Sequence, residues 1–409
     1  MERKKVYLVG IGMGSTGCLT KEAEQIILQS EVLIGASRML EPFRNQKTEH
    51  AQEFFVSYRS GEIGTFLREH SGVSQASVLL SGDVGFYSGA KGLLEELKDF
   101  EVQLVPGISS MIYFSGKLKL SWEDICFTSA HGKTSNLIQR IQRNKKTFAL
   151  LDGPKKLKDL CEKLVYYEMG DVVLHVGEKL SYSDEKIISA KAKNIEDFSF
   201  GNLLVVLAEN EKAVNPVCTS IPDEAFIRAK VPMTKSEVRT VSIGKLQLQQ
   251  DSVVYDIGAG SGSVSIEIAI QSPDIKVYAI EKNTEALELM EKNKRKFAAD
   301  NMEIVSGTAP WALEKLPVPT HVFIGGSSGN METIVDAVFR KNDKVKIVIN
   351  TVALNSMAKV MELIDGREDL ETDIVQMQVS KDNRIGNYHM MMGQNPIYII
   401  SICKKKIER

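Results

Sequence analysis

The sequence predicts an α/β protein with largely parallel sheets, built from two unlike domains. Short β-branched runs alternate with amphipathic helical stretches, beginning with KVYLVG, LTKEAEQIILQS and VLIGA. This alternation is typical of parallel strands joined by crossover helices. A second, dissimilar series follows beyond residue 221, beginning with VVYDIG. The length of 409 residues also exceeds the roughly 250–300 residues that one hydrophobic core supports.

The boundary between the two series is expected where periodicity stops. The first series ends with the apolar run NLLVVLA at 202–208, and the next residues carry Pro216 and Pro222 without a helical or strand pattern. Such a segment is typical of a linker. We expect one domain at 1–210, a linker at 211–220 and a second domain at 221–409, the second with about seven strands.

Composition and charge exclude several classes of protein. The 51 Lys and Arg nearly balance 53 Asp and Glu, so the formal charge of −2 provides no general attraction to nucleic acid. No apolar run approaches the roughly 18–20 residues of a membrane helix, and no signal peptide is recognisable. The five cysteines are scattered without metal-ligand spacing, so we expect no metal site. A cytoplasmic homo-oligomer that binds neither nucleic acid nor membranes is the expectation.

The strongest local signal for function is the segment VVYDIGAGSGS at 253–263. An apolar strand ends in an acid, Asp256, and Gly258, Gly260 and Gly262 follow at alternate positions. Glycines allow a sharp turn at the sheet edge and let a ligand approach the backbone. The next strand ends in Glu281, where an acid can accept the hydroxyls of an adenosine ribose.

The glycine spacing favours S-adenosylmethionine over a dinucleotide. A dinucleotide fold requires GxGxxG or GxGxxA, and Ser263 occupies the last position here. Asp256 also suits the ammonium group of a methionyl tail. Methyl transfer depends mainly on holding the acceptor in line with the methyl group, so we predict no catalytic triad and name no catalytic residue.

The methyl acceptor is less clear from local motifs. Enzymes that methylate adenine or glutamine nitrogens usually carry an NPPY-like turn after the fourth strand, where HVFIGGSSGN stands. The similar NPIY, at 395–398, lies at the final strand, so we interpret it as a strand start at the wrong end of the sheet for this role. A nucleic-acid methyltransferase with an accessory domain stays as an alternative.

The second half resembles the decarboxylating precorrin C15-methyltransferase family. The resemblance rests on IPDEAFIRAKVPMTKSEVR, DIGAGSGSVSIE, SGTAPWAL, VFIGGSSGN and GNYHMMMGQNPIYIIS. It implies a Rossmann-like class I methyltransferase fold. It also implies cofactor contacts from Thr234, the loop Gly258, Ala259, Gly260, Ser261 and Gly262, Glu281 and Ala309. The family often has an acid where Thr308 stands.

The first half resembles the tetrapyrrole methylase family, most closely its precorrin C5-methyltransferases. The segments VYLVGIGMGSTGCLT, LLSGDVGFYSG, VPGISSM and HVGEKLSYSDEKI carry the resemblance. It implies a two-lobed fold, with lobes at about 1–115 and 120–208 and the cofactor in the cleft between them. The residues implied near the cofactor are Gly12, Asp83, Val84, Ser109 and Ser110, and those near the substrate are His131 and Lys133. Most members have a proline where Val84 stands.

Together the two halves resemble the bifunctional family that methylates C5 and C15 of a precorrin and removes carbon dioxide from its C12 acetate. The resemblance implies one S-adenosylmethionine per domain; a fusion with one active domain is the alternative. Because the macrocycle carries about eight carboxylates, we expect it to meet the basic cluster of Arg228, Lys230, Lys235 and Arg239. Whether the substrate holds cobalt stays open.

Overall fold

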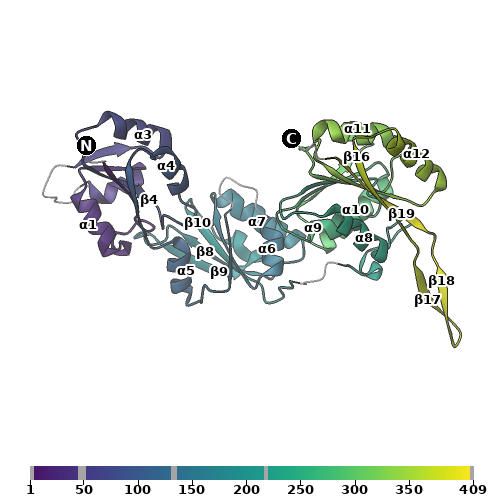
Figure 1. Cartoon of the computed structure of the whole chain (residues 1–409). Helices are drawn as coiled ribbons and strands as arrows, with labels where there is room; N and C mark the ends of the chain where they lie inside the picture. Colours follow the sequence, from purple (N-terminus) through teal and green to yellow (C-terminus); the bar gives the residue numbers. More distant parts are fainter. Residues whose placement is uncertain (1–3, 45–51, 130–135, 216–219, 406–409) are drawn as a thin grey trace. The chain divides into compact units, whose positions relative to one another are not determined.

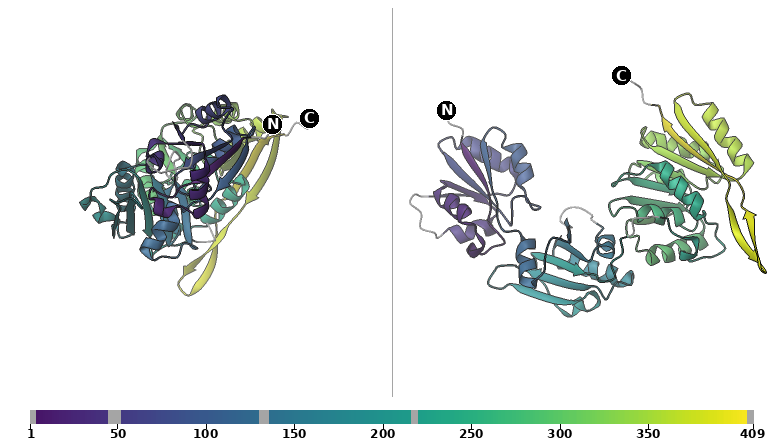
Figure 2. Two further views of the ribbon diagram at one scale, coloured as in Figure 1. Left: turned by 90° about the vertical axis from the view of Figure 1, so that its left-hand side faces the viewer. Right: turned by 60° about the horizontal axis from the view of Figure 1, so that its bottom comes forward.

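The chain folds into two α/β units. The structure is a computed structural model that describes residues 4–44, 52–129, 136–215 and 220–405. One unit comprises 1–137 with 144–213, and the other 138–143 with 214–409. Figures 1 and 2 show helices and strands alternating in both, which confirms the predicted α/β class. Among the described residues, every helix is too short or too polar to traverse a lipid bilayer.

The first lobe of the first unit is built on a parallel sheet with the order β3-β2-β4-β1-β5. Side chains of β1, which lies between β4 and β5, alternate between two apolar clusters, with Val6 and Leu8 in one and Val9 in the other. Both faces are therefore covered, as parallel sheets require. The elements are β1 (Lys5–Gly10), α1 (Lys21–Gln29), β2 (Val32–Gly35), α2 (Ser37–Leu40), β3 (Glu53–Val56), α3 (Ser60–Glu69), β4 (Gln75–Leu80), α4 (Ala90–Glu96) and β5 (Glu101–Val105).

The second lobe carries a mixed sheet with the order β6-β7-β10-β8-β9. Only β6 and β7 are parallel; β10 runs antiparallel to both of its neighbours. The prediction of largely parallel sheets is therefore wrong for this lobe, because alternating runs do not reveal strand direction. The elements are α5 (Ser110–Leu118), β6 (Ile125–Ser129), β7 (Lys146–Leu151), α7 (Pro154–Tyr166), β8 (Val173–Glu178), β9 (Lys186–Lys191) and β10 (Leu204–Glu209). The helix between β6 and β7 in the chain, α6 (Leu137–Arg143), is grouped with the second unit except for its first residue.

The second unit contains a seven-stranded sheet with the order β13-β12-β11-β14-β15-β19-β16. The first five strands are parallel, and β19 runs antiparallel to β15 and β16. The predicted strand number is confirmed. The elements are α8 (Ser236–Leu246), β11 (Val253–Ile257), α9 (Ser263–Ala269), β12 (Lys276–Glu281), α10 (Thr284–Lys296), β13 (Met302–Ser306), β14 (His321–Ile324), α11 (Met331–Lys341), β15 (Lys346–Thr351), α12 (Leu354–Asp365), β16 (Leu370–Met377) and β19 (Ile397–Lys404).

The chain order of the strands reverses between β11 and β14. In open parallel sheets, such a reversal leaves a crevice at the carboxyl ends of the strands, and ligands bind there. Gly258 follows β11, and Gly325 and Gly326 follow β14, so three glycines border this crevice. The fold therefore places the predicted glycine loop at the edge where a ligand is expected.

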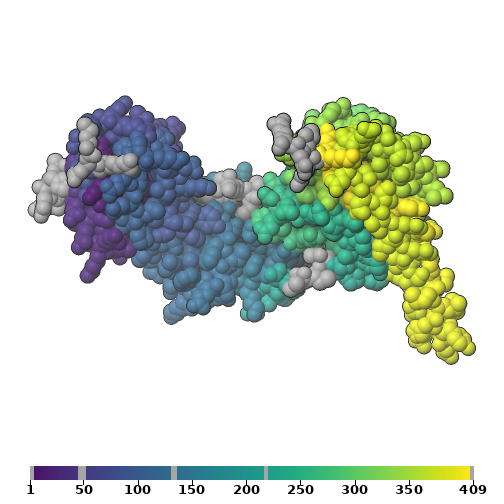
Figure 3. All heavy atoms as spheres, viewed as in Figure 1, coloured from purple at the N-terminus to yellow at the C-terminus, as the bar shows by residue number. Residues whose placement is uncertain are grey.

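A two-stranded ribbon, which the sequence did not predict, extends from the second unit. It consists of β17 (Ser380–Ile385) and β18 (Tyr388–Gly393), paired antiparallel around a turn with Gly386 at φ +62°. Figures 1 and 3 show it projecting beyond the seven-stranded sheet. Its large apolar side chains are exposed: Ile385, Tyr388, Met390, Met391 and Met392.

Candidate active site

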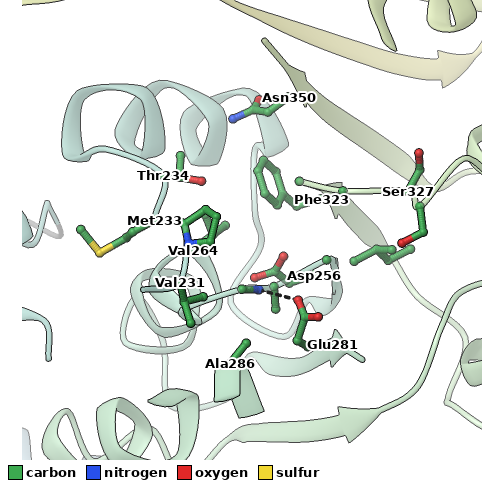
Figure 4. Close-up of a pocket in the computed structure, with 18 of the residues that line it drawn as sticks. Val231, Met233, Thr234, Asp256, Val264, Glu281, Ala286, Phe323, Ser327 and Asn350 are labelled. Carbon is green, nitrogen blue, oxygen red and sulfur yellow. Dashed lines mark hydrogen bonds between the residues drawn. The ribbon is translucent and has the colours of Figure 1, made fainter. Parts of the chain in front are cut away.

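A cavity of ≈790 Å³ lies at the crevice of the second unit. Its lining comes from the segment 230–235, the loop after β11, the ends of β12, β14 and β15, and the residues just before β19. Figure 4 shows Thr234, Phe323, Asp256 and Glu281 around this space. Segments distant in sequence meet here because the strands that precede them are neighbours in one sheet.

The glycine loop is shaped by close backbone packing. Gly258 has φ +74°, and a Cβ on it would lie 2.6 Å from the carbonyl oxygen of Gly326. Its N–H and that of Ala259 donate to the carbonyl of Ile280 at 3.0 and 3.1 Å. Gly260 has φ +55°, and a Cβ on it would lie 3.1 Å from the carbonyl oxygen of Pro232. Positive φ and these contacts together explain why glycine is required at both positions.

Asp256 carries an unsatisfied acceptor in this cavity. Its side chain is 1% exposed, and Oδ2 accepts a hydrogen bond from the hydroxyl of Ser265. Oδ1 is buried and has no hydrogen-bond partner among the described residues. Burial, helped by the nearby charge of Glu281, raises the pKa of the Asp256 carboxyl to about 7. A buried oxygen without a partner is costly, so this position suits a donor or cation supplied by a ligand.

Glu281 braces the glycine loop as well as facing the cavity. Its Oε2 accepts from Gly260 N–H at 3.0 Å, which is the dashed line in Figure 4. Its Oε1 accepts from the N–H groups of Lys282 and Asn283 at 2.8 and 2.9 Å. Because each carboxylate oxygen accepts about two hydrogen bonds, Oε2 retains capacity for a ribose hydroxyl. The loop, Asp256 and Glu281 therefore fit S-adenosylmethionine.

The structure shows that the prediction for Arg239 was wrong. We expected it to bind substrate carboxylates, but its side chain is fully buried. Nε donates to Glu267 Oε2 at 2.6 Å, and Nη1 donates to Asp223 Oδ1 at 3.2 Å. The guanidinium also donates to the carbonyls of Thr234 and Ile221. With its donors used internally, Arg239 cannot reach a ligand.

These contacts give Arg239 a structural role instead. It links α8 to the segment 221–235, whose last residues line the cavity. The Thr234 carbonyl accepts a hydrogen bond from Nη1 at 2.6 Å, and this bond holds the backbone next to the cavity in place. The guanidinium also lies 4.9 Å from the centre of the Phe226 ring, which completes its burial.

The other predicted residues of the second unit divide into two groups. Arg228 is exposed and does not line the cavity. Ser261 is buried, and Gly262 packs against Met290. Both belong to the loop but do not line the cavity. The predicted residues that line the cavity are Lys230, Thr234, Lys235, Asp256, Gly258, Ala259, Gly260, Glu281 and Ala309.

Several lining residues were missed by sequence reasoning, among them Phe323, Ser327, Asn350 and Asn395. The interpretation of 395–398 is correct in one respect, because β19 starts at Ile397. Its placement at the wrong end of the sheet was an error. Because β19 is antiparallel to β15, its first residues reach the same edge as the carboxyl ends of the parallel strands. Strand direction was the missing signal.

A second cavity of ≈710 Å³ lies in the first unit, lined by both of its lobes. Met13 and Gly82 contribute from the first lobe, and Leu180 and Tyr182 from the second. Gly12 does not line it but holds Gly82 through a reciprocal pair of backbone hydrogen bonds, 3.2 and 2.6 Å long. This pair of hydrogen bonds holds Gly82 in the wall of the cavity, and the predicted residue Gly12 therefore acts from behind that wall.

Of the other residues predicted near this cofactor, Ser110 lines the cavity. Asp83 acts on the backbone: its Oδ2 accepts from Gly107 N–H at 3.0 Å and its Oδ1 from Gly85 N–H at 2.8 Å. Val84 packs against an apolar cluster, and buried Ser109 caps α5 by accepting from Ile112 N–H. The predicted substrate residues His131 and Lys133 lie outside the described residues.

Two known protein families match the two halves of the chain. The family of tetrapyrrole (corrin/porphyrin) methylases matches residues 5–196, and the precorrin methyltransferase domain family matches 224–404. A precorrin-6Y C(5,15)-methyltransferase [decarboxylating] from Sinorhizobium sp is 26% identical over 400 residues, which cover 95% of this chain and 93% of that protein.

Matches confined to the second half are closer in sequence. A probable cobalt-precorrin-6B C(15)-methyltransferase (decarboxylating) from Pyrobaculum calidifontis is 40% identical over 184 residues, covering 44% of this chain and 94% of that protein. A crystal structure of a precorrin-6Y C5,15-methyltransferase from Geobacter metallireducens GS-15 is 41% identical, with a TM-score of 0.43, over 46% of this chain and 96% of that chain. The chain belongs to the decarboxylating precorrin C5,15-methyltransferase family, as a fusion of a tetrapyrrole methylase domain with a precorrin methyltransferase domain.

Proposed function

We propose that this chain methylates C5 and C15 of a precorrin or cobalt-precorrin and removes carbon dioxide from the C12 acetate, as a step of corrin ring synthesis. The observation that carries the proposal is the buried Oδ1 of Asp256, to which no described residue donates a hydrogen bond, beside the glycine loop in the cavity of the second unit. The full-length relative supports this function over the nucleic-acid alternative.

The donor chemistry is that of S-adenosylmethionine, whose sulfonium makes its methyl group electrophilic. The protein supplies position and electrostatics. Asp256 Oδ1 would accept from the ammonium of the methionyl tail, and Glu281 Oε2 from a ribose hydroxyl. Because the reduced tetrapyrrole is itself an enamine-like carbon nucleophile, the site needs orientation rather than a nucleophilic side chain. We name no catalytic base.

We further propose that each domain binds one S-adenosylmethionine and that the residue ranges 1–210 and 221–409 act on C5 and C15, respectively. Support comes from the two cavities, one in each unit, each bordered by a glycine turn. In the first unit, Ser110 would contact the ligand directly, while Asp83 and Gly12 hold the loop around Gly82.

We propose that part of the predicted basic cluster, without Arg239, binds the substrate carboxylates that are not removed as carbon dioxide. Lys230 and Lys235 line the cavity, and Arg228 is exposed on the same segment. Charged donors at a cavity mouth attract a polyanion over about one Debye length. We exclude Arg239 from this role because its side chain is buried.

We also propose that the chain acts in the cytoplasm as a homo-oligomer. The described cysteines, Cys18, Cys126, Cys161 and Cys403, are all free thiols, which fits a reducing compartment. The exposed apolar residues of the β17–β18 ribbon support assembly, since contiguous apolar surface of this kind usually marks an interaction site.

Mass spectrometry on a defined substrate tests the proposal. The chain is incubated with precorrin-6B, with or without cobalt, and with S-adenosylmethionine. The expected product has gained two methyl groups and lost one carbon dioxide. Gain of one methyl group without decarboxylation would assign activity to the first domain alone. Titration calorimetry with S-adenosylhomocysteine should give two sites per chain; a single site would contradict one cofactor per domain.

A further inference from the structure

The cavity of the first unit presents one cation that the protein does not neutralise. Among the described lining residues, Arg38 and Lys179 are charged and none is acidic. Lys179 is already paired with Asp184, whose Oδ2 lies 2.5 Å from its Nζ. Arg38, on α2, is exposed and forms no ion pair with any residue in the described parts of the chain. Glu62, which accepts a hydrogen bond from a lining serine, is paired with Arg59 at 3.1 Å instead. The guanidinium of Arg38 is thus available to an anionic ligand.

Arg38 lies on the side of the sheet away from most of the residues predicted near the cofactor. The strand order of this lobe is β3-β2-β4-β1-β5, and the predicted residues Gly12, Asp83 and Ser110 follow or adjoin β1, β4 and β5. Arg38 and the lining residue Tyr58 follow β2 and β3. Because neighbouring strands lie about 4.8 Å apart, the carboxyl edge of a five-stranded sheet spans roughly 19 Å. The β2–β3 side therefore suits a ligand other than the cofactor.

The second lobe reaches this cavity through a strained loop after β8. Ser181 has φ +67° although it is not glycine, and such a conformation persists only where its surroundings hold it. Its Oγ accepts from Ser15 N–H of the first lobe at 3.1 Å. The ring of Tyr182 occupies the space beside Gly14, where a Cβ would lie 2.2 Å from the ring carbon Cζ. The Tyr182 hydroxyl lies 3.5 Å from Arg38 Nη1, so both lobes meet at the guanidinium.

Aromatic side chains accompany the guanidinium. Four aromatic residues line the cavity: Tyr58, Phe86, Tyr87 and Tyr182. Of these, Tyr58 and Tyr87 are 79% and 54% exposed. Aromatic faces bind apolar rings, whereas a guanidinium binds a carboxylate through two parallel hydrogen bonds. A tetrapyrrole combines both features, because carboxylates surround its conjugated macrocycle. The methionyl tail of the cofactor fits less well, since its carboxylate adjoins an ammonium that a guanidinium repels.

We propose that Arg38 anchors a peripheral carboxylate of the tetrapyrrole on which the first unit acts. The inference rests on the proposed function and deepens it, because it names a substrate contact for methylation at C5. One anchored carboxylate restricts the rotation of the macrocycle in its own plane, and it thereby helps to select which ring carbon faces the methyl donor. Arginine suits this role better than lysine, because its planar fork fixes direction as well as charge.

Two arginines of the same lobe provide a matched test. Arg38→Met removes the cation from the cavity lining. Arg44→Met is the control, because Arg44 is exposed and paired with Glu41 at 3.5 Å but does not line the cavity. Arg38→Lys retains the charge without the planar fork. S-adenosylhomocysteine calorimetry on each variant counts the cofactor sites and verifies that the chain is folded.

The readout is the initial rate of methyl gain, measured by mass spectrometry at graded concentrations of precorrin-6B. Methylation at C15 comes with loss of carbon dioxide, so mass separates it from methylation at C5. For C5, Arg38→Met should raise KM about tenfold or more and leave kcat nearly unchanged, because a contact shared by ground and transition states is lost. Arg38→Lys should recover part of this loss, and Arg44→Met should match the wild type.

A wild-type KM in Arg38→Met, or an equal rise in Arg44→Met, would overturn the anchor. An Arg38→Lys variant no better than Arg38→Met would do the same, because it would assign the loss to shape rather than charge. Loss of one S-adenosylhomocysteine site in Arg38→Met would assign the guanidinium to the cofactor and reject the substrate contact. A wild-type chain that adds no methyl group at C5 would instead remove the proposed function of the first unit, and the anchor with it.

Discussion

Arg239 Nε and Glu267 Oε2 lie 2.6 Å apart, with both side chains buried. Arg239 also pairs with Asp223 at 3.2 Å, so one cation is shared between two carboxylates in the interior of the second unit. Burial raises the pKa of Glu267, although the hydrogen bond from Arg239 opposes that shift. Removing the guanidinium would leave Glu267 without a cation and Asp223 with Lys235 alone, at 3.9 Å, so the cluster depends on Arg239.

We predict that Arg239→Met lowers the free energy of unfolding of the second unit by about 3–5 kcal/mol, the usual cost of breaking a buried ion pair from one side. Urea unfolding followed by circular dichroism measures this loss. Arg228→Met, at an exposed position of the segment that precedes α8, is the control and should change stability by less than about 0.5 kcal/mol. Equal effects of the two variants would contradict the structural role of Arg239.

Asp256→Asn should stabilise the ligand-free chain at neutral and alkaline pH. The pKa of Asp256 is raised to about 7 when folded, so the folded state holds its proton where the unfolded state has lost it. Stability therefore falls as pH rises from about 4 to about 7, and removing the carboxyl abolishes that fall. The advantage of the variant should grow over this window, to at most about 4 kcal/mol, and stay level above it.

Thermal denaturation of both proteins between pH 4 and pH 9 tests the sign. The same substitution should weaken binding of S-adenosylmethionine, because the charged acceptor for the ammonium group is lost. A variant that is less stable than the wild type at pH 8, or whose advantage shrinks as pH rises, would show that Asp256 is stabilised in its charged form.

Gly258→Ala should abolish cofactor binding to the second unit. The added Cβ would lie 2.6 Å from the Gly326 carbonyl oxygen, and φ is +74°. Gly329→Ala is a matched control, because Gly329 also has a positive φ, +90°, but no atom within 4 Å of an added Cβ. Calorimetry with S-adenosylhomocysteine should lose one of two sites in the first variant and none in the second. If both variants lose a binding site, or if neither does, close packing at Gly258 is not the cause.

Asp83→Ala should impair methylation at C5 and leave C15 unaffected. The substitution frees the N–H groups of Gly85 and Gly107, which the carboxylate now holds at 2.8 and 3.0 Å. Product analysis should therefore show the decarboxylated C15 product without the C5 methyl group. The second domain of the same chain is the internal control, so a parallel loss of both methylations would point to global unfolding instead.

Local signals in the sequence account for much of the fold and part of the site. The glycine loop was predictable because its positive φ values and close backbone contacts admit almost no other residue. Glu281 was predictable because it ends the next strand. The burial of Arg239 was not, since its carboxylate partners lie 16 and 28 residues away and no local pattern joins them.

Part of the cavity lining was also beyond sequence reasoning. Asn350 lies near the carboxyl end of the parallel strand β15. Asn395 reaches the same edge because β19 runs antiparallel to β15, and strand direction leaves no trace in hydropathy. The β17–β18 ribbon escaped prediction for a related reason. Its side chains are exposed on both faces, so no alternation between core and solvent marks its strands.

The ribbon and the cavity share one short stretch of chain. β18 ends at Gly393, Gln394 and Asn395 line the cavity, and β19 begins at Ile397. The Gln394 N–H is anchored to the Val379 carbonyl at the base of the ribbon, 2.8 Å away. A partner bound to the ribbon would therefore also restrain Gln394 and Asn395 in the wall of the cavity, so that binding to the ribbon and binding in the cavity would be thermodynamically linked.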